Sequence, residues 1–162
     1  MPPFSAEDAT LVRETFRSAA AAPETFAAAY FRRLFELDRS LRRLFHGDMR
    51  QLGQKLVSTL GVLVNNLDAF SEFAPHMRAL GARHAGYQVR DEYYAIAGIA
   101  LIGALAGQLG ERFTPEARTA WTRVLGAITD EIVAGSRSVA APHAPRPESS
   151  ALPFGVPSRG TA

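Results

Sequence analysis

The sequence predicts an all-α protein with one ordered domain and a disordered C-terminal tail. Apolar residues recur at spacings of three and four along most of the chain, and helix-start signals precede several of these segments. No segment alternates apolar and polar residues as a half-buried strand does. The 162 residues fit a single domain, and the 47% that are hydrophobic suffice for a sizeable core.

The first helices are predicted from their start signals. Ser5 followed by Asp8 resembles a capping box. The apolar face behind it comprises Leu11, Val12 and Phe16. Pro23 suits a first helical turn and should open a helix that runs to about Leu37, since proline loses no needed hydrogen bond there. A short helix is expected next, over residues 40–45.

Three further helices are predicted in the middle of the chain. The first should cover residues 49–67, because its apolar residues recur at spacings of four, four and three. These residues are Leu52, Leu56, Leu60 and Leu63. The second should cover 73–85 and stop at Gly86, and the third should run from Asp91 to about Leu109.

The last helix has the strongest start signal, in which Thr114 supplies the cap, Pro115 the first helical position and Glu116 an acid in the first turn. Its apolar face comprises Trp121, Val124, Leu125, Ile128 and Ile132. We expect the ordered domain to span residues 1–136. The remaining residues, 137–162, are rich in Pro, Ser and Ala and lack periodicity, so we expect a disordered tail.

Composition argues against several classes of function. The chain has no cysteine, so disulfides, zinc fingers and iron–sulfur clusters are not available to it. Its net charge is only +2 and its arginines are scattered, so we expect no nucleic-acid partner. No secretory leader or membrane-spanning apolar run is recognisable. We therefore expect a cytoplasmic protein without a membrane partner.

His84 is the residue that points to chemistry, because it continues an apolar stripe formed by Met77, Leu80 and Gly81 and should face the core. A buried imidazole needs a hydrogen-bond partner or a metal, and a hydrogen-bonded core histidine is the commoner outcome. No His, Asp or Glu lies three or four residues from it, which argues against zinc. A metal that brings its own equatorial ligands, as in haem, would need only this one side chain.

Four sequence words resemble globins in their order and separation. They are RRLF at 42–45, KLVSTLG at 55–61, LGARHAGYQV at 80–89 and AWTRVLG at 120–126. The likeness covers about residues 5–135 and is closest to bacterial single-domain haemoglobins of the Vitreoscilla type and to the globin module of flavohaemoglobins. The resemblance implies a globin fold, helices packed around a pocket for haem b, and His84 as the proximal iron ligand.

The resemblance also assigns other residues to the haem. These are Phe45, Leu52, Lys55, Leu56, Leu80, Arg83, Val89 and Tyr94. Phe45 would wedge against the haem, Lys55 and Arg83 would reach its propionates, and Tyr94 would help to orient His84. Ordinary alternatives stay open for each: core packing for Phe45, solvation for Lys55 and Arg83, and a helix contact for Tyr94.

Two distal positions depart from the family pattern. Relatives usually carry Gln or His where this chain has Leu52, and often Tyr where it has Phe31. The ligand pocket would then consist of Phe31, Phe45, Leu52 and Leu56. Such a pocket has no hydrogen-bond donor, so we expect fast loss of dioxygen and easy oxidation of the iron. Gln51 lies on the outer face by periodicity, whereas the Tyr30 hydroxyl is an alternative donor.

A third departure is Ser136, which stands where relatives carry a Glu that contacts the proximal His and tunes the metal. We therefore expect a protein that reversibly binds a diatomic gas, oxygen, carbon monoxide or nitric oxide, rather than an enzyme, and that is a monomer or homodimer. One alternative is a nitric oxide dioxygenase served by a separate reductase. The other is a haem-free globin-fold regulator in which His84 is a plain core residue.

Overall fold

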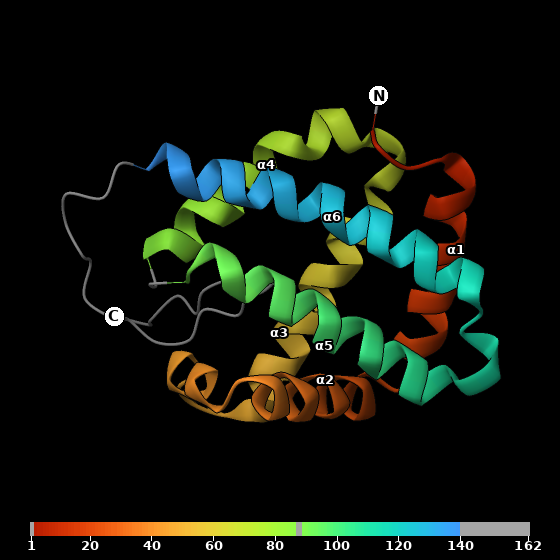
Figure 1. The fold of residues 1–162 in the computed structure, drawn as a ribbon, viewed down its shortest axis with the longest axis horizontal. Helices are drawn as coiled ribbons and strands as arrows, with labels where there is room; N and C mark the ends of the chain where they lie inside the picture. The colour runs from red at the N-terminus through yellow and green to blue at the C-terminus, as the bar shows by residue number, and fades with distance from the viewer. Residues whose placement is uncertain (1, 87–88, 140–162) are drawn as a thin grey trace.

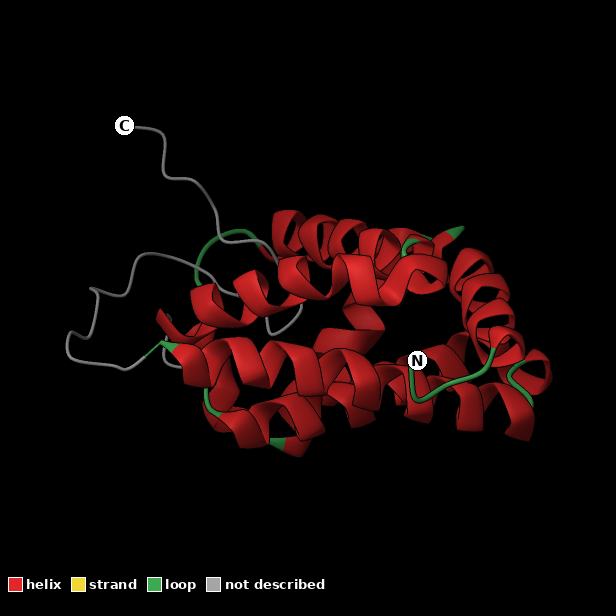
Figure 2. Cartoon of the chain, turned by 90° about the horizontal axis from the view of Figure 1, so that it is seen from above, coloured by secondary structure: helices red, strands yellow, loops and turns green. Residues whose placement is uncertain are grey.

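The computed structural model describes residues 2–86 and 89–139 and shows only helices and loops in them, as Figures 1 and 2 show. The predicted all-α class is thus confirmed. The elements in chain order are α1 (Ala6–Ala20), α2 (Pro23–Leu37), η1 (Arg39–Leu44), α3 (Met49–Asn65), η2 (Leu67–Ala69), α4 (Phe70–Gly86), α5 (Asp91–Leu109), η3 (Gly110–Arg112) and α6 (Pro115–Ser138), where η marks a 3₁₀ helix.

The helices begin where side chains satisfy the first backbone N–H groups. The Asp8 N–H donates to Ser5 Oγ over 3.0 Å, and the Ser5 N–H donates to Asp8 Oδ2 over 2.9 Å, so the predicted capping box is present. Thr114 Oγ1 accepts from the Ala117 N–H over 3.1 Å. Pro23 opens α2 as predicted.

Two predicted boundaries were wrong by a few residues. The helix expected over 49–67 ends at Asn65, because the Asn66 side chain donates to the Val62 carbonyl over 2.8 Å and the chain tightens into η2. The next helix begins at Phe70 rather than 73. The tail predicted from residue 137 begins too early, because α6 continues through Arg137 to Ser138. From position 140 onward it lies outside the described residues and stays a prediction.

The hydrophobic core gathers around α5, which runs through the middle of the molecule in Figure 1 and packs on α1, α2 and α6. No membrane-spanning run was expected from the sequence, yet by length and composition residues 91–112 are apolar enough to cross a membrane. Their apolar side chains instead serve the interior, where Ala97, Ala100, Leu101, Ala104 and Leu105 are wholly buried. This segment is therefore the core helix of the bundle.

Candidate cofactor site around His84

His84 is fully buried near the C-terminal end of α4, as its apolar stripe predicted. Its Nδ1 lies 2.7 Å from the carbonyl oxygen of Leu80, one turn earlier. Because a carbonyl only accepts hydrogen bonds, Nδ1 must carry the proton. Nε2 then carries the lone pair, and it is the atom with which this imidazole would bind a metal.

The surroundings of His84 keep the imidazole neutral. Burial lowers its pKa to about 4 from an ordinary 6.5, with a smaller opposing effect from the hydrogen bond to Leu80 and a small further lowering by the Arg83 charge. A metal ligand must be deprotonated, so this shift favours the form of histidine that coordinates.

Two glycines allow α4, the helix that carries His84, to pack in backbone contact with α6. A Cβ on Gly81 would clash with the carbonyl oxygen of Ile132, and one on Gly135 would clash with that of Arg78. The backbones of α4 and α6 therefore touch one turn before His84. Sequence reasoning placed Gly81 on the apolar side but missed this crossing, because it depends on Ile132, which is 51 residues away in the chain.

Tyr94 lies beside His84 in the core. The two ring centroids are 6.4 Å apart, and Tyr94 is 1% exposed. Burial, aided by the negative charge of Asp91, raises the pKa of the Tyr94 hydroxyl, so the phenol keeps its proton at neutral pH. The proximity agrees with the predicted role of Tyr94 next to the histidine, although that role itself stays a prediction.

The predicted ligand-pocket aromatics come together at the end of η1. Phe45 packs edge-on against Phe31 with centroids 5.4 Å apart and against Phe35 at 5.5 Å. A Cβ on Gly53 would lie 2.8 Å from the Ala27 Cβ and 3.9 Å from the Phe31 ring, so α2 and α3 cross closely there. Phe31 thereby lies against the turn of α3 that begins at Leu52.

Leu52 and Leu56 are buried on the inner face of α3, at 2% and 0% exposure. Gln51 is exposed, which confirms that the polar residue beside Leu52 points outward. Tyr30 is wholly buried, its ring packs on Phe31 at 5.3 Å, and its hydroxyl has no hydrogen-bond partner in the described residues. Its place in a distal pocket stays a prediction.

The remaining predicted contacts divide between core and rim. Leu80 and Val89 are buried, and the Val89 N–H donates to the His84 carbonyl over 3.3 Å, so the chain after α4 returns to the histidine. Lys55 is half-buried and Arg83 is exposed. Their roles toward propionates stay predictions.

Ser136 stands where the resemblance to globins implies a glutamate, and a carboxylate from another helix lies beside it. Ser136 Oγ donates to the Val133 carbonyl over 2.9 Å and lies 3.5 Å from Asp91 Oδ1. Arg137 donates to Asp91 Oδ2 from Nη2 and Nε over 2.9 and 3.1 Å. Sequence reasoning treated Asp91 only as a helix start and missed this cluster. Asp91 comes from α5, not α6.

A bare metal ion has no cage here, because the described residues hold no cluster of three or more His, Cys, Asp or Glu. His46 and His76 are exposed, and His143 lies outside the described residues. One neutral, buried imidazole near apolar walls suits a metal already held by a macrocycle. The donor set therefore fits haem.

A globin family model matches residues 28–132, a span that contains Phe31, Phe45, Leu56, His84 and Tyr94. The chain belongs to the globin family. The all-helical globin fold is thus confirmed, and membership of this family implies haem binding.

This globin is similar to the flavohemoprotein of Deinococcus radiodurans, at 28% identity over 134 residues, 78% of this chain and 32% of the relative. The flavohemoprotein of Bordetella parapertussis is 28% identical over 126 residues, 76% of this chain and 31% of the relative. The chain thus spans about a third of these proteins. An engineered carbene transferase, made from a candidate nitric oxide dioxygenase of Rhodothermus marinus, shares the fold at a TM-score of 0.74 and 23% identity, covering 84% of this chain and 95% of that one.

Proposed function

We propose that this globin holds haem b through Nε2 of His84 and reversibly binds a diatomic gas. The observation that carries the proposal is the state of His84: fully buried, neutral, and oriented by the hydrogen bond from Nδ1 to Leu80. Haem b would supply an iron atom with one open position for the gas. Lys55 and Arg83 would offer positive charge to the propionates, at the edge of the pocket.

The distal side chains would let the pocket admit several diatomic gases without selecting dioxygen among them. Phe31, Phe45, Leu52 and Leu56 are all buried and all apolar. They would exclude water from the gas but donate no hydrogen bond to it, so dioxygen would leave quickly. Fast loss of dioxygen would suit reversible binding of oxygen, carbon monoxide or nitric oxide better than oxygen storage. We propose a cytoplasmic monomer or homodimer for this role.

A second candidate function is nitric oxide dioxygenase activity with a separate reductase. The names of the relatives favour it, since flavohemoproteins pair haem with a flavin and the solved relative derives from a candidate nitric oxide dioxygenase. Leu52 and Ser136 disfavour it, because the first removes a distal donor and the second a proximal carboxylate.

The test uses the full chain expressed with haem and reduced. We expect the visible spectrum to change when oxygen is added and to return when argon removes it. A spectrum that shows irreversible oxidation of the iron within the mixing time would contradict reversible binding. Adding nitric oxide, oxygen, a reductase and its electron donor separates the second candidate. Sustained nitrate production over many turnovers would favour the enzyme, and production that stops after one equivalent would rule it out.

A further inference from the structure

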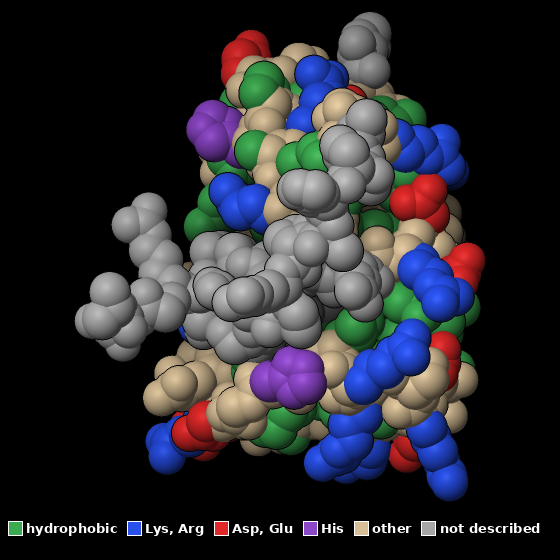
Figure 3. All heavy atoms as spheres, turned by 90° about the vertical axis from the view of Figure 1, so that its left-hand side faces the viewer, with side chains coloured by type: hydrophobic (Ala, Val, Ile, Leu, Met, Phe, Trp, Pro, Cys, Tyr) green, Lys and Arg blue, Asp and Glu red, His purple; other side chains and the backbone are tan. Residues whose placement is uncertain are grey.

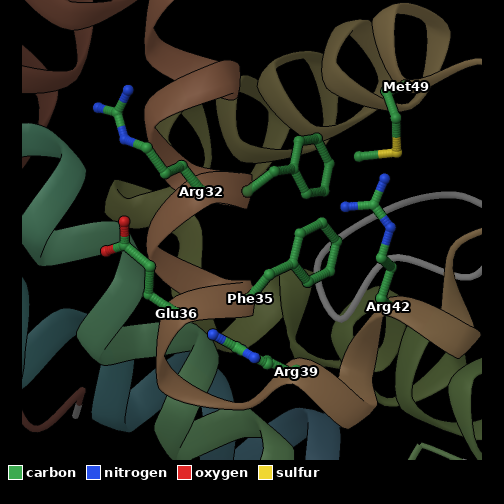
Figure 4. A pocket seen from close by; sticks show the side chains of 7 residues that line it. Arg32, Phe35, Glu36, Arg39, Arg42 and Met49 are labelled. Atoms are coloured by element: carbon green, nitrogen blue, oxygen red, sulfur yellow. The ribbon is translucent and has the colours of Figure 1, made fainter.

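A cavity of about 680 Å³ opens at the surface between α2, η1 and the first turn of α3 (Figure 4). Its volume lies within the range of roughly 300–1,000 Å³ that is usual for small-molecule sites. Neither His84 nor Tyr94 lines it, so it is separate from the proposed iron ligand.

The apolar lining of this cavity is aromatic. The rings of Phe31 and Phe35 stack with centroids 6.1 Å apart and an interplanar angle of 19°. The Met49 thioether completes the lining, and in Figure 4 it and the Phe35 ring point toward the same space. Flat rings stack well on phenyl faces, and thioethers make favourable contacts with aromatic rings. The lining therefore favours an aromatic occupant over an aliphatic chain.

The charged lining is mostly positive. Arg32, Arg39 and Arg42 border the cavity, with Glu36 as its one carboxylate. The Arg42 guanidinium lies 5.4 Å from the centroid of the Phe35 ring. Among the described residues these three arginines form no ion pair. Figure 3 shows basic side chains gathered along the lower part of one face, level with α2 and η1 in Figure 1.

We propose that this cavity is a binding site for an aromatic carboxylate. The ring would pack on Phe31, Phe35 and Met49, and the carboxylate would meet the guanidinium group of Arg42, with Arg39 adding positive charge at the border of the cavity. A guanidinium offers two parallel N–H donors to a carboxylate, and stacking on Phe35 holds that of Arg42 in place. Among its lining residues only Phe31 is also proposed to line the gas pocket, so the site shares one wall with that pocket and none of its residues with the iron ligand.

Phe31 and Phe35 both contact Phe45, the residue expected to pack on the haem. The test therefore uses the full chain loaded with haem and saturated with carbon monoxide, so that the probe cannot occupy the iron. The probe is 2-naphthoate, titrated by calorimetry. We expect one site with a Kd on the order of 100 µM, as is usual for a ligand of this size.

The variants test the charged lining. The double variant with Arg39→Gln and Arg42→Gln should raise the Kd for 2-naphthoate about tenfold or more. Glu36→Gln should lower this Kd severalfold. The matched control is Arg118→Gln, since Arg118 also lies over a phenylalanine, Phe113, at 5.5 Å but away from this cavity. It should leave the Kd unchanged. Equal binding by the double variant, or equal loss in the control, would overturn the site.

Two further probes test the ligand class. Neutral 2-naphthol should bind about tenfold more weakly, because it lacks the carboxylate. Decanoate should also bind more weakly, because it lacks the ring. No heat with 2-naphthoate, or binding of either comparison probe as tightly, would overturn the proposal. If the protein takes up no haem, the empty haem pocket would offer the probe a second apolar site. The variant with both Arg39→Gln and Arg42→Gln then decides, because undiminished binding by it would overturn the proposed site.

Discussion

Gly81 in α4 and Gly135 in α6 each lie against the backbone of the other helix, with no room for a side chain between them. Gly81 faces the carbonyl of Ile132, one turn before Gly135. Gly135 faces the carbonyl of Arg78, one turn before Gly81. This contact fixes α4 on α6, and His84 follows Gly81 by one turn. The position of the proposed iron ligand therefore depends on two residues without side chains.

The crossing predicts that Gly81→Ala and Gly135→Ala are each destabilising. The added methyl would meet a carbonyl oxygen well inside contact distance, and α4 would have to move away from α6. We expect a loss of about 2–4 kcal/mol in the free energy of unfolding, measured by urea denaturation. Gly126→Ala is the control, because a Cβ at Gly126 in α6 meets nothing within 4 Å. It should be neutral or stabilising by up to ~1 kcal/mol. Equal effects at Gly81 and Gly126 would contradict the close crossing.

A second prediction concerns the effect of Leu52 on the dissociation rate of the bound gas. Leu52 lies on the buried face of α3 and is 2% exposed, so Leu52→Gln introduces a hydrogen-bond donor on that face. A hydrogen bond to partly charged dioxygen is worth ~1–3 kcal/mol, so its dissociation should slow by roughly 5- to 150-fold. Carbon monoxide carries less charge, and its dissociation should change less. Both rates follow from stopped-flow mixing.

Gln51→Leu is the matched control for Leu52, since Gln51 is the neighbouring exposed residue. Its dissociation rates should equal those of the parent protein. If Leu52→Gln also leaves dioxygen dissociation unchanged, Leu52 does not face the gas and the apolar distal pocket is wrong.

Much of the fold could be predicted from the sequence because local signals mark it. Pro23 and Asp91 start α2 and α5 at the predicted residues. The end of α3 could not be predicted, because the Asn66 side chain competes locally with the helix. The Asp91–Arg137 pair joins residues far apart in the chain and has no local signal.

The distal site shows a different limit of sequence reasoning. Helix α2 packs on both α3 and α5, so two of its faces are buried and periodicity does not separate Tyr30 from Phe31. In α3 only one face is buried, and the pattern correctly assigned Leu52 inward and Gln51 outward. His84 was predicted to be buried, whereas its role as iron ligand depends on the resemblance to globins.

Tyr30 gives a prediction about stability. Its hydroxyl is buried without a partner among the described residues, which costs free energy in the folded state. Tyr30→Phe should therefore raise the free energy of unfolding by up to ~1 kcal/mol. The control is Tyr93→Phe, because the Tyr93 hydroxyl accepts from Arg43 over 3.4 Å and its removal should not stabilise the protein. A clear loss of stability in Tyr30→Phe, or faster dioxygen loss, would show that the hydroxyl has a partner in the loaded protein.

The lowered pKa of Asp8 predicts how the free energy of unfolding depends on pH. The backbone N–H of Ser5 donates to the Asp8 carboxylate and holds its pKa below the ordinary 3.8, with help from the Ser5 hydroxyl and Arg123 against the cost of burial. Because the folded pKa is the lower one, the stabilisation is present above pH 4 and is lost as the pH falls through the folded value. Asp8→Asn should cost about 1 kcal/mol at pH 7 and progressively less below pH 4, by urea denaturation. Glu7→Gln, an exposed neighbour, is the control, and a cost for Asp8→Asn that is the same at pH 7 and pH 3 would contradict the linkage.

The central claim is that His84 binds haem iron. The most direct measurement is the visible spectrum of the reduced, haem-supplied chain with carbon monoxide, for the parent, His84→Gly and the exposed-site control His76→Gly. We predict a strong Soret band that shifts with carbon monoxide in the parent and the control. His84→Gly should lose this band and regain it when free imidazole is added, because imidazole can occupy the space of the missing ring. A parent without a Soret band, or a His84→Gly spectrum identical to that of the parent, would contradict the account.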